Sequence, residues 1–120
     1  MDGDQPHRLM VGALAVSALG AWLHNGLEGI PTWSPETMSA VLPTVVLAAW
    51  WWRGENRILR WVTVVWVLGL HLVVGALLSV LPLPIWPFVP DQDLGHYLAH
   101  ILYATTQLPA LHLLWRSRPA

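Results

Sequence analysis

Four long apolar stretches, separated by short polar or proline-rich segments, set the pattern of this chain. They cover about residues 9–29, 35–52, 58–81 and 93–115 once their polar ends are included. Each is close to the roughly 20 residues with which an α-helix crosses a bilayer. Apolar runs of this length exclude a closed barrel of short strands. The pattern therefore predicts an all-α integral membrane protein, a four-transmembrane-helix bundle that forms a single domain over residues 1–120.

The connecting segments carry signals that start and stop helices. In IPTWSPET, Ser34 stands where an N-cap is expected and Pro35 occupies the first helical position. The segment LPLPIWPFVP is too rich in proline to form a regular helix. Asp91 or Asp93 is then expected to cap the last helix.

Every arginine falls at one end of the predicted bundle. The arginines precede the first stretch, separate the second from the third, and follow the fourth: Arg8, Arg53, Arg57, Arg60, Arg116 and Arg118. Short loops rich in arginine stay in the cytoplasm. This distribution predicts a multi-pass protein of the cell (plasma) membrane with both termini cytoplasmic.

The first stretch has one alternative interpretation, a cleaved signal peptide. Small residues near Ala15 and Ser17 resemble cleavage sites. The leader MDGDQPHR, however, carries two acids beside one arginine, whereas a signal peptide prefers a basic leader. A retained first helix is therefore the expectation.

The composition supports a chain surrounded by lipid. Apolar residues make up 55% and charged residues 11%, against about 25% charged residues in soluble domains. There is no Cys, which excludes disulfides and thiolate metal sites. No basic tract or glycine-rich phosphate loop is present, so no nucleic-acid partner is expected. The tryptophans are expected to mark the two membrane interfaces, the inner one by Trp50, Trp51, Trp52, Trp61 and Trp115 and the outer one by Trp33 and Trp86.

Polar side chains interrupt the fourth stretch at regular spacing. His96, His100, Tyr103 and Gln107 are separated by four, three and four residues. At 100° per residue they fall within about 60° of one another on a helix. Ionisable groups within membrane spans usually face the interior of the bundle. These four side chains are therefore expected to form one inward-facing stripe.

Two other stretches contribute ionisable groups at similar depth. His24 and Glu28 share one face of the first helix, and His71 lies within the third stretch. If these faces turn inward, His24, His71 and His100 meet in the outer half of the membrane. His96 and Glu28 then lie above them, nearer to the outer surface.

This set of side chains suits a transition-metal ion. Neutral imidazoles bind Cu or Zn, and Glu28 is available as a further ligand or as a partner of a ligating histidine. Met38, near the outer end of the second helix, would favour Cu(I), and Tyr103 and Gln107 are supporting residues. Haem b ranks below a metal because no span carries two aligned histidines at the spacing of stacked haems, although Gly20, Gly69 and Gly75 would widen a slot.

Two other functions fit the same pattern. The stripes would serve only helix association if the chain were a non-catalytic accessory or assembly subunit of a larger membrane complex. Its partners would then be other membrane subunits or copies of itself, besides the lipid bilayer. Alternatively, a small proton-coupled transporter or a quinone-reactive enzyme would use His100 and Glu28 to move protons. On its own the chain is not expected to be an enzyme, and no residue is assigned a catalytic role.

Overall fold

The computed structural model describes residues 5–117, and these residues form helices and loops without any strand. The helices are α1 (Gln5–Leu27), α2 (Pro35–Arg53), a third rod and α4 (Leu94–Arg116). The third rod runs without a break through α3 (Arg57–Val64), η1 (Val65–Leu77) and η2 (Leu78–Val80). The all-α prediction with four long helices is confirmed. The largest difference in bounds is at α1, which begins four residues before the predicted position 9.

Side-chain caps fix where three of the helices begin. Ser34 accepts a hydrogen bond from the backbone N–H of Thr37 at the start of α2, with Pro35 next to it. Asn56 caps α3 in the same way. Of the two predicted caps of α4, Asp93 is the one used, and its carboxylate accepts from the N–H of His96 at 2.8 Å. These caps supply acceptors for N–H groups that a helix start leaves unpaired.

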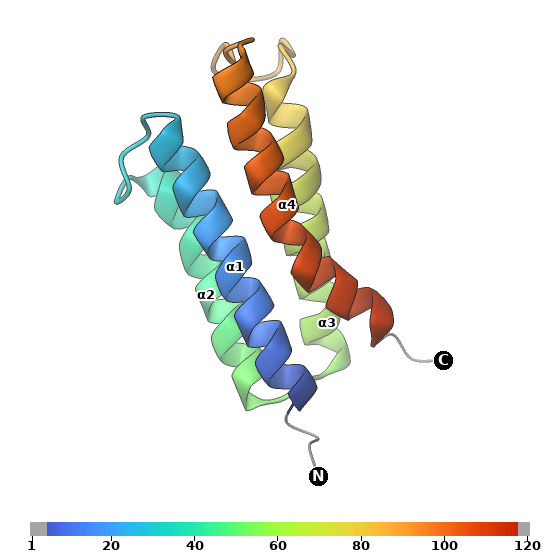
Figure 1. The fold of residues 1–120 in the computed structure, drawn as a ribbon. Helices are drawn as coiled ribbons and strands as arrows, with labels where there is room; N and C mark the ends of the chain where they lie inside the picture. The colour runs from blue at the N-terminus through green and yellow to red at the C-terminus, as the bar shows by residue number, and fades with distance from the viewer. Residues whose placement is uncertain (1–4, 118–120) are drawn as a thin grey trace.

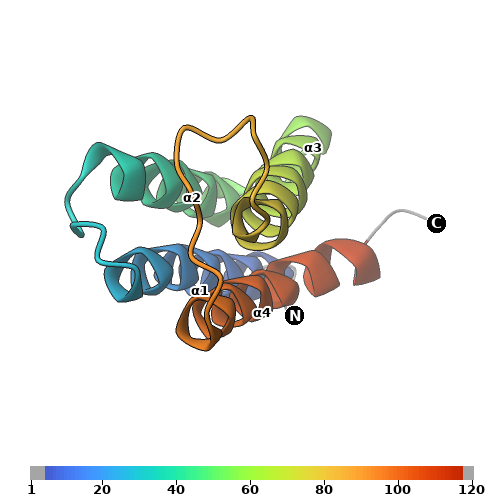
Figure 2. The ribbon, with the colours of Figure 1, turned by 90° about the horizontal axis from the view of Figure 1, so that it is seen from above.

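The four helices lie side by side, with α1 beside both α2 and α4 and the third rod beside α4 (Figures 1 and 2). One end of the bundle holds the starts of α1 and α3 and the ends of α2 and α4. We call it the arginine end, because the described arginines lie there: Arg8, Arg53, Arg57, Arg60 and Arg116. Arg118 lies outside the described residues. The opposite end, where α1 stops and α4 starts, is called the histidine end.

A glycine allows α1 and α4 to approach closely. A Cβ atom placed on Gly20 would lie 1.7 Å from Oγ1 of Thr106. Gly12 lies nearer the start of the same helix, and a Cβ atom placed there would have no neighbour within 4 Å. Small residues at such crossings are common in membrane bundles, where close backbone contact replaces a hydrophobic driving force.

The middle of the third rod is wound more widely than an α-helix. η1 is a π-helix over 13 residues, although π-helical turns are usually short insertions in α-helices. Its buried residues Val67, His71 and Ala76 are four and five positions apart, which matches the i→i+5 bonding of a π-helix. The wider turn brings His71 and Ala76 onto the same inward face.

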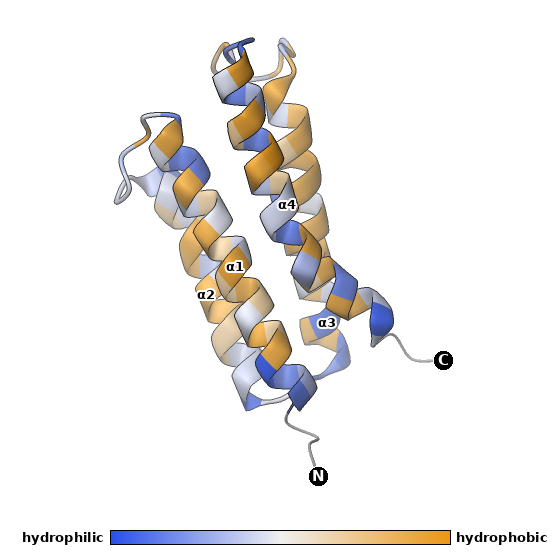
Figure 3. Cartoon of the chain, in the orientation of Figure 1, coloured by the Kyte–Doolittle hydropathy of each residue, from blue (hydrophilic) through white to orange (hydrophobic). Residues whose placement is uncertain are grey.

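Apolar side chains cover much of the outside, and polar side chains lie inside. Exposed large residues include Leu19, Val46 and Ile101, each at least half exposed. Figure 3 shows hydrophobic residues along the lengths of all the helices and hydrophilic ones near both ends of the bundle and along part of α4. The buried polar residues come from every helix: Ser17, His24, Thr37, Thr44, Thr63, His71, His96, His100 and Gln107. Within residues 5–117, two helices are long and apolar enough to cross a membrane, Gln5–Leu27 and Arg57–Val80.

The arginine half of the interior is an apolar core. Its buried members are Met10, Ala13, Leu14, Leu47, Trp51, Leu59, Val67, Ala110 and Leu114. Trp51 was expected at the membrane interface, but the structure buries it, and its indole N–H donates to Oγ1 of Thr63 at 2.9 Å. The other half of the interior contains the histidines.

Candidate functional site

The predicted stripe of α4 faces the interior of the bundle. His96, His100, Tyr103 and Gln107 are all buried. His24 of α1 is buried opposite them, and Glu28 lies one residue beyond the end of that helix. His112, on another face of α4, is exposed.

Glu28 and His96 form the outermost pair of the site. The carboxylate Oε2 of Glu28 lies 2.6 Å from Nδ1 of His96. The other ring nitrogen of His96, Nε2, is buried and has no hydrogen-bond partner among the described residues. The His96 side chain is only 9% exposed. Because the carboxylate accepts the proton on Nδ1, neutral His96 keeps an unused lone pair on a buried Nε2.

His100 is oriented by a backbone carbonyl of the third rod. Its Nδ1 lies 2.8 Å from the carbonyl oxygen of Ala76. A carbonyl only accepts, so Nδ1 of His100 carries the proton, and the lone pair of the neutral ring is on Nε2. That Nε2 faces Nε2 of His24 at 3.0 Å. The His96 and His100 rings are also neighbours, with centroids 4.4 Å apart.

His24 is oriented by a short chain of hydrogen bonds at the turn after α1. Its Nδ1 lies 2.9 Å from Oδ1 of Asn25. The amide nitrogen of Asn25 donates to Oγ1 of Thr37, and that hydroxyl donates its own proton to the carbonyl of Pro31 at 2.9 Å. Because the Thr37 proton is used by Pro31, the amide of Asn25 presents its oxygen to His24. His24 therefore also carries its proton on Nδ1 when neutral.

The three histidines thus share one arrangement. A carboxylate, a side-chain amide and a backbone carbonyl each accept a proton from an Nδ1 atom. Metal-ligating histidines usually have this kind of acceptor on the nitrogen that does not bind the metal. Two of the Nε2 lone pairs face each other at 3.0 Å. Facing lone pairs repel, so this contact is favourable only when a shared proton or a metal ion lies between them, or when one of the two rings carries its proton on Nε2.

The side chains as placed do not yet surround an ion. Among the described residues, no group of three or more His, Asp or Glu side chains has its ligand atoms gathered around one point. Zn–N bonds of about 2.0–2.1 Å imply about 3.3 Å between two ligating nitrogens in a tetrahedral site. The His24–His100 separation of 3.0 Å is slightly shorter. A small opening of this pair and a turn of the His96 ring would be needed to complete a three-histidine site.

His71, which was expected to join the same site, belongs to an adjacent cluster nearer the arginine end. Its Nδ1 is 2.5 Å from the hydroxyl of Tyr103, and its Nε2 is 2.9 Å from Oγ1 of Thr44. The indole N–H of Trp66 also donates to Thr44 at 2.8 Å. Both ring nitrogens of His71 are therefore occupied. The ring of Tyr103 lies between His24 and His71, at centroid distances of 5.0 and 5.6 Å.

The remaining supporting residues serve helix contacts. Gln107 is hydrogen-bonded to the side chain and the backbone carbonyl of Ser17, which ties α4 to α1. Met38 is half-buried; its backbone N–H donates to the carbonyl of Ser34 at 2.9 Å, and its side chain makes no hydrogen bond with the described residues. Two of the glycines that would widen a haem slot are closely approached, Gly20 by Thr106 and Gly75 by Tyr103.

An opening lined by acids lies beside the outermost pair. This recess has a volume of about 560 Å³ and is lined in part by Glu28, Asp91, Asp93 and His96. Carboxylates at the entrance of a cleft attract cations. The recess therefore favours a cation at the histidine end, beside Glu28 and His96.

Comparisons with known protein families, with curated proteins and with solved structures found no match for this chain. The interpretation of the site thus rests on its geometry. Sequence reasoning had missed the groups that orient the histidines, Asn25 and the carbonyl of Ala76. The position of Asn25 directly after His24 was a usable signal, but nothing in the sequence marks a particular backbone carbonyl.

Proposed function

We propose that this chain is a four-span protein of the cell membrane that binds a transition-metal ion, Zn or Cu, at the histidine end. His24, His96 and His100 are the ligands through Nε2, and Glu28 holds His96 in the ligating tautomer. The acidic recess beside Glu28 and His96 lies at the histidine end, so we infer that the metal enters from outside the cell and can be passed on to an acceptor there.

The membrane part of the proposal is supported by the distribution of side chains. Two of the four helices meet the length and hydropathy of a span. α2 and α4 have similar lengths, of 19 and 23 residues, and they also expose apolar side chains and bury polar ones. Exposed apolar faces of this extent are favourable against lipid, whereas soluble monomers rarely have them. The arginines at one end support an orientation with that end in the cytoplasm.

One observation carries the metal part of the proposal. Three buried histidines each have Nδ1 on an oxygen acceptor, while Nε2 of His96 has no partner and those of His24 and His100 face each other. A buried nitrogen without a partner is unfavourable by about 1–3 kcal/mol. A metal ion on the three Nε2 atoms would remove this penalty. The all-imidazole ligand set, with Met38 elsewhere, favours Zn or Cu(II) over Cu(I).

The polar groups do not continue through the bundle. They follow one another from Glu28 to Thr44. Beyond Thr44 the arginine half is mainly the apolar core, and the hydroxyl of its buried Thr63 is used by Trp51 and the carbonyl of Leu59. A proton or ion path across the membrane would need polar groups or water in that half. This arrangement supports binding and delivery on one side more than proton-coupled transport.

The direct test is the metal content of the full chain purified in mild detergent, measured by mass spectrometry of the elements. We expect stoichiometric Zn or Cu in the wild type and its loss in H24A, H96A and H100A. H112A is the matched control, because His112 is exposed on another face of α4. H71A should keep its metal, because both nitrogens of His71 are used by Tyr103 and Thr44.

Two results would overturn the proposal. A metal-free wild type that does not take up Zn or Cu on titration would exclude the metal site, whether or not the variants fold. Release of the chain from membranes by an alkaline carbonate wash would exclude the four-span assignment. Unchanged metal content in H24A, H96A and H100A would show that these histidines are not the ligands.

A further inference from the structure

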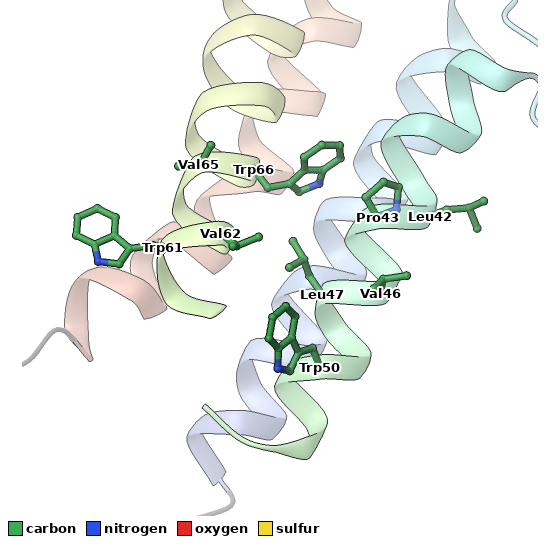
Figure 4. A pocket seen from close by; sticks show the side chains of 9 residues that line it. All are labelled: Leu42, Pro43, Val46, Leu47, Trp50, Trp61, Val62, Val65 and Trp66. Carbon is green, nitrogen blue, oxygen red and sulfur yellow. The ribbon is translucent and has the colours of Figure 1, made fainter. Parts of the chain in front are cut away.

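A groove runs between α2 and the third rod toward the arginine end. It has a volume of about 750 Å³, and its lining is almost wholly apolar. Leu47 and Trp50 on α2 face Val62 and Trp66 across it (Figure 4). α2 and the third rod meet mainly near their ends and at Thr44, where Trp66 and His71 are hydrogen-bonded. The space between them is therefore not closed by side-chain packing.

The groove leads into a polar recess at the α2–α3 loop. The two share Val46 and Trp50, and the recess continues to Arg53, Gly54 and Asn56 with a volume of about 640 Å³. Arg53 is exposed and has no ion-pair partner within residues 5–117.

The acid of the same loop is not available to Arg53. Glu55 forms an ion pair with Arg60 at 2.6 Å, and Arg60 also donates to the carbonyl of Leu114 at 3.0 Å. Arg60 thus neutralises the loop acid and is itself held against α4. Within residues 5–117, Arg53 therefore remains as a cation without an ion-pair partner at the end of an apolar groove.

We propose that the groove binds an anionic glycerophospholipid, with one acyl chain between Leu47, Val62 and Trp66 and the phosphate at Arg53. The proposal rests on the membrane location proposed above but not on the metal site. The volume lies within the 300–1,000 Å³ of typical ligand pockets. An apolar lining suits hydrocarbon, and the exposed guanidinium of Arg53 suits a phosphate, which arginine binds through two parallel hydrogen bonds.

A quinone fits this groove less well. Its carbonyl oxygens would need donors in the apolar part, and the indole N–H of Trp66 already donates to Thr44. Anionic lipids are enriched in the cytoplasmic leaflet, which is where the arginine distribution places Arg53. Charge and polarity along the groove thus match a phospholipid lying parallel to the helices.

Native mass spectrometry of the detergent-purified full chain tests this proposal. The protein is titrated with phosphatidylglycerol or with phosphatidylcholine carrying the same acyl chains. We expect one lipid molecule to bind per chain, with a higher affinity for phosphatidylglycerol than for phosphatidylcholine. R53Q should reduce the affinity for phosphatidylglycerol about fivefold, since one arginine near the surface contributes about 1 kcal/mol. R116Q is the control, because Arg116 lies at the same end of the bundle outside the groove.

A second pair of variants tests the acyl-chain part. V46W should fill the groove and abolish binding of both lipids. V45W places the same side chain on the neighbouring residue, which is exposed and does not line the groove, and this variant should bind both lipids normally.

Equal binding of the two lipids by the wild type, or unchanged binding in both R53Q and V46W, would overturn the proposal. So would a dimer that V46W dissociates, because the occupant would then be a second copy of the chain. Retained Zn or Cu in V46W would show that the metal site stands independently.

Discussion

The two halves of the bundle interior are equally buried but chemically opposite. The arginine half is filled by apolar side chains such as Leu14 and Leu59, each 0% exposed. The histidine half is filled by imidazoles, a phenol and an amide that hydrogen-bond from helix to helix. α1 and α4 contribute to both halves, with Leu14 and Ala110 in one and His24 and His100 in the other.

This difference indicates separate roles for the halves. Close packing of apolar side chains holds helices together without specifying any ligand. Buried imidazoles are unfavourable when a ring nitrogen is left unpaired, as Nε2 of His96 is among the described residues. We infer that the arginine half supplies stability and that the histidine half is kept polar for binding.

The largest expected effect comes from opening the apolar half. L14A should destabilise the protein by about 2–5 kcal/mol, because a fully buried leucine is replaced by a cavity. Thermal unfolding in detergent measures the change. L19A is the control, since Leu19 is 50% exposed on the same helix. Metal bound per folded chain should not change; its loss in L14A would mean that the halves are not separable.

The next effect concerns the boundary between the halves. G20A forces a methyl group against Thr106 and should destabilise the protein by about 1–3 kcal/mol. Because His24 and His100 lie on the two helices that would be pushed apart, metal affinity should fall as well. G12A adds the same methyl group where nothing lies within 4 Å and should be neutral in both measurements. Equal behaviour of the two variants would contradict the close α1–α4 contact.

A change confined to the polar half should affect binding more than stability. E28A removes the acceptor that orients His96 and should lower metal affinity roughly 10- to 100-fold, as for other partners of ligating histidines. Competition with a chelator of known affinity gives the value. E36A removes an exposed acid near the same end and should have no such effect. If both variants weaken binding equally, Glu28 acts only through its charge.

The smallest effect is expected in the adjacent His71 cluster. Y103F removes the hydroxyl bonded to His71 and should destabilise the protein by about 1 kcal/mol, the usual size of one interhelical hydrogen bond. Thermal unfolding measures this loss, and metal content should stay at the wild-type value. If Y103F were free of metal, Tyr103 would belong to the metal site, and the His71 cluster would be part of that site and not a separate one.

The helices and the polar stripe were predictable because both follow from local spacing. Apolar runs gave the four helices, Ser34 and Asp93 gave two of the caps, and the intervals between His96 and Gln107 gave one buried face. These features depend on residues only a few positions apart. The burial of Trp51 could not be predicted in this way, since it depends on Thr63 of another helix.

The composition of the site was predicted only in part, because it depends on helix rotation and on backbone atoms. The wide turns of η1 direct His71 toward Tyr103 and Thr44 and bring the carbonyl of Ala76 to His100. A helix assumed to turn 100° per residue does not predict this register. The grouping of His24, His96, His100 and Glu28, by contrast, needed only matched depth and face.

X-ray absorption at the metal edge of the Zn- or Cu-loaded protein tests the three-histidine site most directly. We expect the metal to have only nitrogen and oxygen neighbours, at about 2.0–2.1 Å for Zn, with the outer-shell scattering of three imidazoles. H71A should give the same spectrum, and H96A should lose one imidazole. A sulfur neighbour from Met38, or an imidazole lost in H71A and none in H96A, would contradict it.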